Sequence, residues 1–571
     1  MIRGPARSRR YGATLALELN IIPLWLWATL PKSSNAQITS RRTASMVQTL
    51  SSSFLATDDQ HPAELTACPE DSNVSHCTHP PHGQWDAIVV GAGVAGAAMA
   101  YALGTDGRKV LLIGKFGLAR GSCTLAEPTL AHVSWTLGPI KRPRDLAEPD
   151  RIVGELMQPG GIQALQKLGL EDTIDNIDGI TTQGYLVCYE GKQVTLNYPI
   201  NPQTGKAYCG KSFHHGRFVQ NLRRACQEVK SIKVVQATVN TLIENPILDR
   251  VVGVTYTLCG KKSGAVESAF APITVVADGG ASKFRQTYLK TEPVGRSQFY
   301  GFIIRDCPLP ARENGHVILS KIAPVLMYQI DTYETRVLVD VPNAARQAHP
   351  GDIKSYLREQ VLPDIPVVLR PKFAEAIETE RLRSMPNRFL PSAMNTQDGL
   401  VYLGDALNMR HPLTGGGMTV ALWDVVHLKD LLSKSVVESF YDSHLVMAQL
   451  SNFHWVRKSR SSAINILAQA LYTLFSARDD PDLKVLREAC FDYFRLGGTC
   501  ITTPMGLLGG VFSSPLLLMY HFFAVVLYGM FCFLMNSAGP VAFVMNLGRA
   551  GSVLWMGCKV FLPLLWAELQ S

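Results

Sequence analysis

Short apolar runs that end in glycine alternate with helical patterns over most of this chain. The run Ala87–Val90 ends at Gly91 and is followed by small residues at helical spacing. Similar runs are Val110–Ile113, Val275–Ala277 and Val401–Leu403. Continuous apolar runs of this length are typical of strands buried on both faces of a parallel sheet. The pattern therefore predicts an α/β fold with a Rossmann-type nucleotide-binding domain.

The pattern changes between Phe299 and Asp340, where apolar residues alternate with others. The segments 301–304, 325–330 and 336–340 each follow this alternation, which predicts antiparallel strands. Aromatic and aliphatic side chains dominate them, so they suit the floor of a pocket for a hydrocarbon, which is held by burial of apolar area.

The C-terminal region is the most apolar part of the chain. An uncharged run from Leu516 to Met535 is followed by a break at 536–540 and a second apolar stretch to Trp566. Twenty apolar residues can span a bilayer. Because His521 lies in the first run and two cations lie in the second, we expect a helical hairpin that dips into one leaflet, with a spanning hairpin as the alternative.

The N-terminal 84 residues have a different composition. Arginines precede an apolar run, 15–30, that Glu18 and Pro23 interrupt, so it is interpreted as a signal anchor, a signal peptide or a disordered leader. Residues 32–84 are rich in Ser, Thr, Pro and His, which indicates a linker.

Composition narrows the function classes. Hydrophobic residues make up 47% of the 571 positions and charged residues 18%, and the net charge of +8 is diffuse. No basic run is interleaved with aromatics, so nucleic acid is not an expected partner. A basic surface suits an anionic membrane leaflet or an acidic redox partner.

The twelve cysteines include no C-x-x-C pair, which predicts reduced thiols and a catalytic body that faces the cytosol. One group of Cys and His residues matches no zinc spacing, so we expect no metal site; its members are Cys68, His76, Cys77, His79 and His82.

The first apolar run carries a dinucleotide fingerprint, G-x-G-x-x-G, between a strand and a helix. Gly91 permits the tight turn, Gly93 leaves room for a pyrophosphate, and Gly96 allows the helix to pack on the strand. Val94 and Ala95 lie inside the motif, at the helix N-terminus, and are included among the expected cofactor contacts.

Two other strand ends carry an aspartate next to a glycine. Asp278 follows one strand, and Gly404-Asp405 follows another and leads into a loop with three consecutive glycines, 415–417. Such a loop lets backbone N–H groups approach an anion or a planar ring. Together with the fingerprint, these strand ends describe one large cofactor held at three points.

The second strand departs from the fingerprint pattern. An acidic residue that binds ribose is expected at its end, but Gly114-Lys115 stands there. The segment 114–143 has no helical or strand period, and is interpreted as a surface insert or a mistranslated segment. Asp145 and Glu155 are the nearby carboxylates if this segment is left out.

Several long sequence blocks together resemble the squalene monooxygenase (squalene epoxidase) family over about residues 85–571. They are the fingerprint stretch, 150–161, 212–218, 276–279 with 282–285, 382–386, and 403–418. The resemblance implies FAD as the cofactor and a flavin hydroxylase-like fold. It also implies cofactor contacts from a set that includes Gly415 and Gly416 of the loop, and Arg144, Arg151, Arg217, Asp405 and Met418.

On the substrate side, Tyr185 matches the active-site tyrosine of that family. The resemblance implies that its hydroxyl bonds to Gln158 and shapes the space over the flavin. His214 and His215 are expected to be packing or surface residues.

The reaction that the resemblance implies is epoxidation of squalene to (S)-2,3-epoxysqualene with O2 in sterol biosynthesis. Because the chain shows a single dinucleotide fingerprint, electrons are expected from a separate enzyme, NADPH-cytochrome P450 reductase. The expected location is the endoplasmic reticulum membrane, in contact with membrane lipid, with lipid droplets as a second location.

These expectations divide the chain into five parts: a leader and linker, 1–84; the first part of the FAD-binding domain, 85–290; the substrate-binding domain, 291–385; the second part of the FAD-binding domain with helices, 386–500; and membrane-associated helices, 501–571. Two other functions remain open. One is a flavin-dependent reductase of isoprenoid double bonds, and the other is an inactive homologue that lost FAD through the irregularity at 114–143.

Overall fold

The computed structural model describes residues 84–115, 149, 151–259, 266–349, 351–476, 480–537 and 539–570. The predicted leader and linker, the Cys and His group at 68–82, Arg144, Asp145 and most of the segment 114–143 lie outside them.

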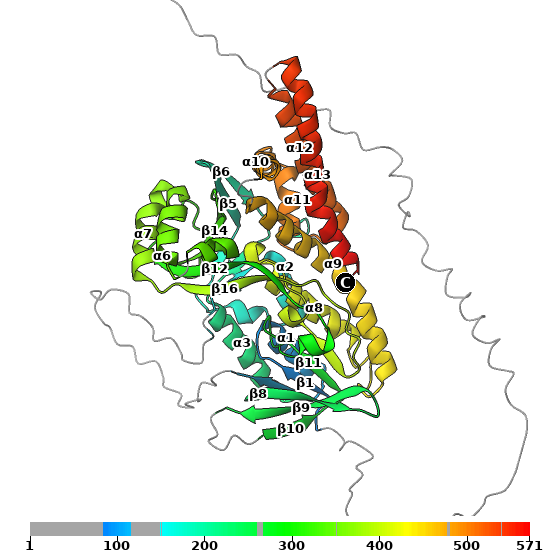
Figure 1. The fold of residues 1–571 in the computed structure, drawn as a ribbon. Coiled ribbons are helices and arrows are strands. Elements are labelled where there is room, and N and C mark those ends of the chain that lie inside the picture. Colours follow the sequence, from blue (N-terminus) through cyan, green and yellow to red (C-terminus); the bar gives the residue numbers. More distant parts are fainter. Residues whose placement is uncertain are drawn as a thin grey trace, which may run out of the picture. The chain divides into compact units, whose positions relative to one another are not determined.

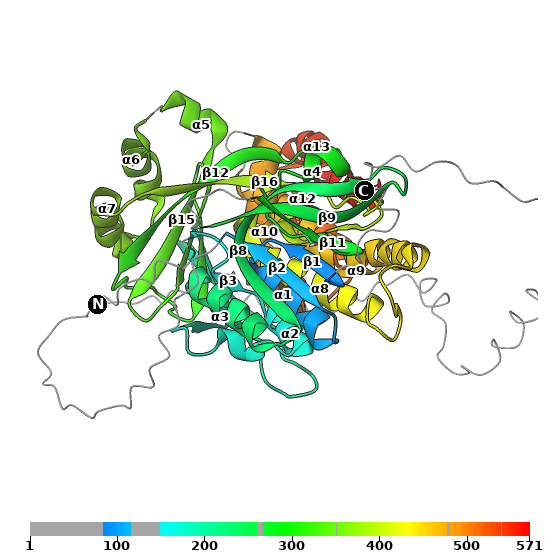
Figure 2. The ribbon, with the colours of Figure 1, turned by 90° about the horizontal axis from the view of Figure 1, so that it is seen from below.

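The first sheet has seven described strands in the order β10-β9-β8-β2-β1-β11-β17 (Figures 1 and 2). The strands from β8 to β17 run parallel, and β9 and β10 continue the sheet in antiparallel fashion. Their bounds are β1 Ala87–Val90, β2 Val110–Gly114, β8 Ile232–Asn245, β9 Arg250–Leu258, β10 Val266–Phe270, β11 Ile273–Val276 and β17 Leu400–Tyr402. The four apolar runs that predicted buried parallel strands are therefore confirmed as β1, β2, β11 and β17.

Helix α1 (Val94–Thr105) packs against the first sheet and against α3 (His215–Glu228) and α8 (Gly417–Leu431). Figure 2 shows α1 and α3 side by side on this sheet. The small residues Ala97 and Ala98 are fully buried in α1, which allows the close approach of helix and strand. Helix α2 (Pro159–Leu168) lies against α8.

The second sheet also has seven described strands, in the order β16-β12-β15-β14-β13-β5-β6. The strands are β5 Gly184–Tyr189, β6 Lys192–Asn197, β12 Val294–Arg305, β13 Asn314–Leu319, β14 Pro324–Gln329, β15 Glu334–Pro342 and β16 Arg383–Phe389. The predicted antiparallel strands between Phe299 and Asp340 are confirmed as parts of β12, β14 and β15.

Two strands of the second sheet come from the range predicted for the FAD-binding domain. The hairpin β5–β6 joins the sheet because β5 pairs in parallel with β13, so 85–290 contributes to both sheets. The alternation of apolar residues does not reveal this partner, which lies more than a hundred residues further along the chain.

Smaller elements lie between the strands of the two sheets along the chain. A third sheet of short strands, in the order β3-β7-β4, lies near the cavity described below. The remaining strands and the helices and turns before residue 415 are β3 Leu156–Met157, β4 Ile180–Thr182, β7 Gly210–Ser212, α4 Arg285–Tyr288, α5 Asn343–Ala348, α6 Ile353–Tyr356, α7 Arg370–Thr379, and the turns η2 Glu171–Ile174, η3 Leu357–Val361, η4 Leu362–Asp364, η5 Val367–Leu369, η6 Gly404–Ala406 and η7 Pro412–Thr414.

The C-terminal part is helical, with α9 Ser443–Phe475, α10 Pro481–Arg495, α11 Thr499–Leu508, α12 Pro515–Met535 and α13 Pro540–Gln570. Helices α12 and α13 form the expected hairpin, drawn in orange and red in Figure 1. Both are long and apolar enough to cross a membrane, with mean hydropathies of 2.0 and 1.4 over an 18-residue window of each helix. His521 of α12 is buried and bonds to the Tyr493 hydroxyl of α10 over 2.9 Å.

Candidate functional site

The turn between β1 and α1 is built so closely that only glycine fits at two positions. Gly91 has φ of +106°, and a Cβ there would lie 2.3 Å from the carbonyl oxygen of Ala277. A Cβ on Gly96 would lie 1.8 Å from the carbonyl oxygen of Gly91. At Gly93 an added Cβ meets no protein atom within 4 Å, so this residue presents bare backbone to open space.

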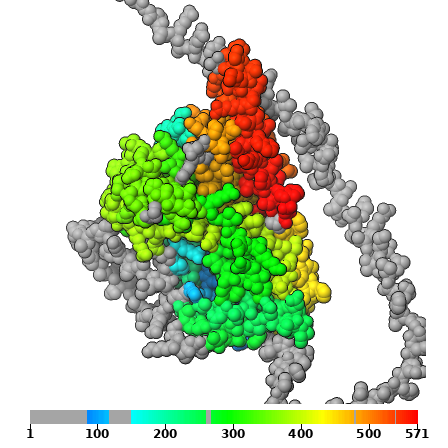
Figure 3. Space-filling view, in the orientation of Figure 1, coloured from blue at the N-terminus to red at the C-terminus, as the bar shows by residue number. Residues whose placement is uncertain are grey.

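The three glycine and aspartate strand ends lie at one edge of the first sheet. Because β1, β11 and β17 are parallel neighbours, their carboxyl ends meet there. Gly91, Asp278 and Gly404 all line one cavity of about 1360 Å³. Figure 3 shows a recess in this face in which blue and cyan residues are visible.

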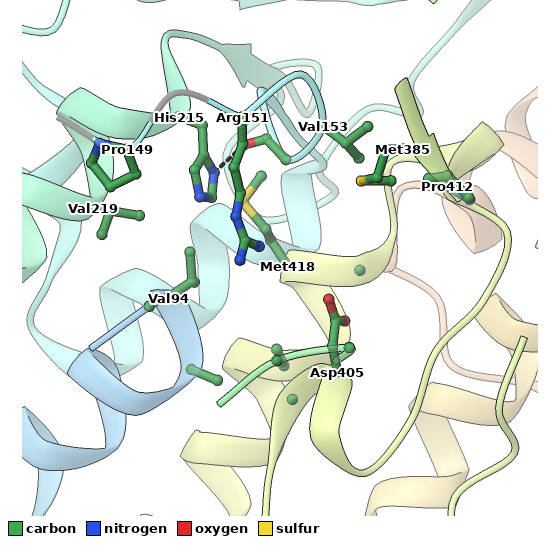
Figure 4. A pocket seen from close by; sticks show the side chains of 18 of the residues that line it. Val94, Pro149, Arg151, Val153, His215, Val219, Met385, Asp405, Pro412 and Met418 are labelled. Atoms are coloured by element: carbon green, nitrogen blue, oxygen red, sulfur yellow. Dashed lines mark hydrogen bonds between the residues drawn. The ribbon is translucent and has the colours of Figure 1, made fainter. Parts of the chain in front are cut away.

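The two aspartates have different surroundings. Asp278 is largely buried, which raises the pKa of its carboxyl group, and its Oδ1 has no hydrogen-bond partner among the described residues. Asp405 is exposed to the cavity, and Figure 4 shows its carboxylate directed toward Arg151 and Met418. Arg285 donates to the carbonyl oxygens of Asp405, at 3.2 Å, and Gly280, at 2.7 Å, and so ties the two loops together.

The wall opposite Asp405 carries basic groups. Arg151 is exposed to the cavity, and His215 lies beside it (Figure 4). Burial lowers the pKa of His215 to about 4, and its Nδ1 lies 2.8 Å from the carbonyl oxygen of Gly154, so the neutral ring donates from Nδ1. Arg223 donates through Nε to the carbonyl oxygen of Ala92 at 2.9 Å, and burial lowers its pKa to about 10.

Most predicted cofactor residues line this cavity: Gly91, Gly93, Val94, Ala95, Arg151, Asp278, Gly404, Asp405, Gly415 and Met418. Gly96 and Gly416 do not line it, since their positions face Gly91 and Ile464 and serve close packing. Arg144 lies outside the described residues.

Arg217 is not brought to the cavity. Its guanidinium donates to Asp178 at 2.8 Å and to the carbonyl oxygen of Ile177 at 3.3 Å. Arg223 lies six residues further along α3, on a different face of the helix, and reaches the cavity instead. The expected carboxylate Glu155 is also elsewhere: it is buried, pairs with Arg336 and does not line the cavity.

A buried hydrogen-bond cluster occupies the boundary between the two sheets. Gln158 donates to the Tyr185 hydroxyl and to the carbonyl oxygen of Thr414, both at 2.6 Å. The Tyr198 hydroxyl donates to the amide oxygen of Gln158 at 2.5 Å. Tyr185 lines the cavity, and burial raises its pKa to about 12, so its phenol is neutral. The contact between Tyr185 and Gln158 that the resemblance implied is present.

The far end of the cavity is apolar. It is formed by side chains of the second sheet, of β3 and of the segments next to them: Ile152, Leu156, Leu326, Tyr328, Leu338 and Leu413. Behind this wall, Arg336 makes a two-pronged contact with Glu155, at 2.8 and 2.9 Å, which joins β15 to the residue before β3.

The turn η7 before the glycine loop is held by His411. Its Nδ1 accepts the N–H of Leu413 at 3.2 Å, and its Nε2 lies 3.5 Å from Asp340 of β15. Tyr472 of α9 stacks on the ring, with 3.8 Å between the ring centroids. The sequence patterns indicated no role for His411, Arg223 or His316. Of these three residues, Arg223 and His316 line the cavity. One feature of the sequence could have identified Arg223: it is a charged residue among apolar ones on the buried face of α3.

Comparison with solved structures defines the class of the fold. A mutant of PqsL from P. aeruginosa superposes with a TM-score of 0.54 at 20% identity, and covers 69% of this chain and 97% of its own. The myxobacterial halogenase CndH, of the FAD-dependent halogenases, gives 0.54 at 16% identity over 74% and 96%. The p-nitrophenol 4-monooxygenase PnpA from Pseudomonas putida gives 0.52 at 16% identity over 72% and 98%. The chain thus has the fold of the flavin-dependent monooxygenases and halogenases.

Sequence comparison is more specific. Residues 270–547 match the family model for squalene epoxidase. Squalene epoxidase erg1 of Aspergillus fumigatus is 44% identical over 85% of this chain and 94% of its own length. Squalene epoxidase erg1 of Schizosaccharomyces pombe is 39% identical over 85% and 99%, and squalene monooxygenase of Mus musculus is 40% identical over 89% and 81%. This chain belongs to the squalene epoxidase family.

Proposed function

We propose that this chain is an FAD-dependent monooxygenase that converts squalene into (S)-2,3-epoxysqualene in sterol biosynthesis. The balanced reaction consumes squalene, O2, two electrons and two protons, and yields the epoxide and water. The observation that carries the proposal is the single cavity: three glycine and aspartate strand ends line one end, and apolar side chains line the other.

The residues of the cavity fit FAD. Gly91 and Gly93 present backbone to a pyrophosphate without side chains in the way, and α1 begins at this point. Asp278 offers a buried carboxylate oxygen that has no partner among the described residues. Arg151, Asp405 of the turn η6 and Met418 of the first turn of α8 would contact the cofactor from the surrounding walls. When bound, FAD supplies the activation of O2.

The chain's own residues position the reactants. The apolar end buries squalene and excludes water from the reacting alkene. Tyr185, held by Gln158, lies where the cofactor end and the apolar end meet, so we assign it and Gln158 the task of orienting the reactants. With a pKa of about 12, Tyr185 stays protonated at neutral pH and acts as a neutral hydrogen-bonding group.

The proposal includes an electron donor and a cellular location. One dinucleotide fingerprint is present in the sequence, so electrons come from a separate NADPH-cytochrome P450 reductase. The two apolar C-terminal helices attach the protein to lipid, and the proposed compartment is the endoplasmic reticulum membrane.

The test uses the purified full chain in detergent. We expect bound flavin absorbance and conversion of squalene to its epoxide with reductase, NADPH and air. Flavin-free protein that does not bind added FAD would favour the inactive homologue. Reduction of an isoprenoid double bond without O2 would favour the isoprenoid reductase.

A further inference from the structure

The last turn of α13 contains a buried carboxylate, although most of this helix exposes apolar side chains. Glu568 is 3% exposed, whereas Trp555 and Trp566 of the same helix are 70% and 60% exposed. Figure 1 shows the C-terminus beside α9, and α13 contacts this helix. Burial of a carboxylate costs free energy unless hydrogen bonds satisfy it.

Three residues of α9 donate hydrogen bonds to the carboxylate and the backbone carbonyl oxygen of Glu568. Ser462 donates to Oε2 of Glu568 at 2.9 Å, and Asn465 donates to Oε1 at 2.8 Å. Lys458 donates to the backbone carbonyl oxygen of Glu568 at 2.8 Å. Positions 458, 462 and 465 lie on one face of the helix, so this face of α9 is a receptor for the end of α13.

The same face continues to the cofactor loop. The side-chain oxygen of Asn408 accepts from Asn465 at 3.2 Å, from Arg457 at 3.3 Å and from Arg410 at 2.7 Å. Asn408 lies between Asp405 and Gly415, which line the cavity, and Arg410 lines it as well. One amide oxygen therefore links α9 to the loop that holds the cofactor.

The buried charges form one group. Arg410, Arg457 and Lys458 are the cations, and Asp424 and Glu568 are the carboxylates. Asp424 already holds Arg457 through two contacts, at 2.9 and 2.8 Å. Loss of Glu568 would leave the cations with one carboxylate fewer in a region of low dielectric, and the hydrogen bonds around Asn408 would rearrange.

We propose that Glu568 is a positioning residue for the cofactor loop: when the last turn of α13 is seated on α9, the loop 404–418 has the geometry that binds FAD. The inference rests on the proposed function, because it assumes that FAD occupies the cavity. It couples the lipid-facing hairpin to cofactor retention.

The first experiment measures the FAD dissociation constant of the full chain in detergent. Because mutations along coupled networks change affinity by modest factors, we expect Glu568→Ala to raise this constant roughly tenfold and Glu568→Gln roughly threefold. Glu488→Gln removes an exposed carboxylate on α10 and is the matched control, with no expected change. An unchanged constant in both Glu568 variants would overturn the inference.

The second experiment needs no variant. Coupling is reciprocal, so FAD should slow hydrogen exchange in residues 560–570 of the wild type by a similar factor. In Glu568→Gln, exchange should rise in 404–418 and stay unchanged in β12–β15. A uniform rise across the chain would indicate general destabilisation and would also overturn the inference. If the wild type binds no FAD, it is the proposed function that fails.

Discussion

At the first sheet the cavity wall contains several glycines that present backbone, whereas at the second sheet large side chains dominate it. Gly91, Gly93 and Gly404 leave the cofactor end bare, and the aspartates stand at strand ends. Leu326, Tyr328 and Leu338 line the apolar end, which is the proposed substrate end. Gly91 and Gly404 tolerate almost no substitution, since both have positive φ and an added Cβ would lie within 3 Å of a neighbouring atom. Side-chain recognition by buried area tolerates changes of similar volume. We therefore expect all-or-none effects of mutation at the glycine-lined end and graded effects at the apolar end.

The largest effect is expected from Gly96→Ala. The added Cβ would lie 1.8 Å from the carbonyl oxygen of Gly91, so the β1–α1 turn must move, at roughly 3 kcal/mol or more. The purified variant should contain no bound flavin. Gly548→Ala, on α13, meets no atom within 4 Å and should leave flavin content unchanged. Normal flavin content in Gly96→Ala would contradict the claim that the glycine-lined end tolerates almost no substitution.

The next effect concerns the junction of the sheets. Glu155→Gln removes the carboxylate charge that pairs with the buried guanidinium of Arg336, and breaking such a buried pair typically costs about 3 to 5 kcal/mol. Thermal unfolding should shift to a lower temperature. The double variant Glu155→Leu with Arg336→Met replaces the pair by apolar groups and should recover much of the loss. A shift equivalent to less than 1 kcal/mol in the single variant would contradict this expectation.

Acid should weaken the cofactor end through His215. Its folded pKa of about 4 lies below the usual 6.5, so between these values the unfolded chain binds a proton that the folded chain does not. Stability therefore falls as the pH drops through 6.5 toward 4, by roughly 2 kcal/mol between pH 7 and pH 5.

Urea unfolding at pH 7 and pH 5 measures this loss. His215→Asn should reduce the difference between the two pH values, while His316, whose pKa is also lowered to about 4, continues to contribute. An equal difference in wild type and variant would assign the acid sensitivity to other groups.

The smallest effect is expected at Tyr185. Tyr185→Phe removes the hydroxyl that Gln158 contacts, and the loss of one hydrogen bond should lower kcat/KM for squalene roughly tenfold, or ~1.4 kcal/mol. Flavin content should stay normal. Tyr256→Phe removes a hydroxyl that bonds to Glu267 at 3.0 Å, away from the cavity, and is the control. A loss of flavin in Tyr185→Phe would show that Tyr185 also supports cofactor binding, and would contradict the functional separation of the two ends.

The strands, glycine turns and helix of the proposed cofactor end could be predicted because their signals are local. A strand, a glycine and a helix follow one another in the chain, and the structure adds only their convergence at one sheet edge. The substrate end depends on pairings between distant segments, such as β5 with β13, which no local pattern encodes.

Side chains on α3 show the same limit. Arg217 and Arg223 are both arginines of one amphipathic helix, and helical rotation alone decides that the second lines the cavity. His411 was visible within the glycine-loop motif, but its contact with Asp340 joins residues from both sheets and exists only after folding.

The interleaved strand order limits how this molecule can be recombined. Among the described strands, the chain passes from β2 to the second sheet at β5, back at β8, out again at β12 and back at β17. A hybrid that exchanges one sheet with that of a homologue therefore requires four junctions. A single crossover between residues 189 and 383 would split both sheets between two parents, so gene shuffling should select for parents whose strand contacts are already alike.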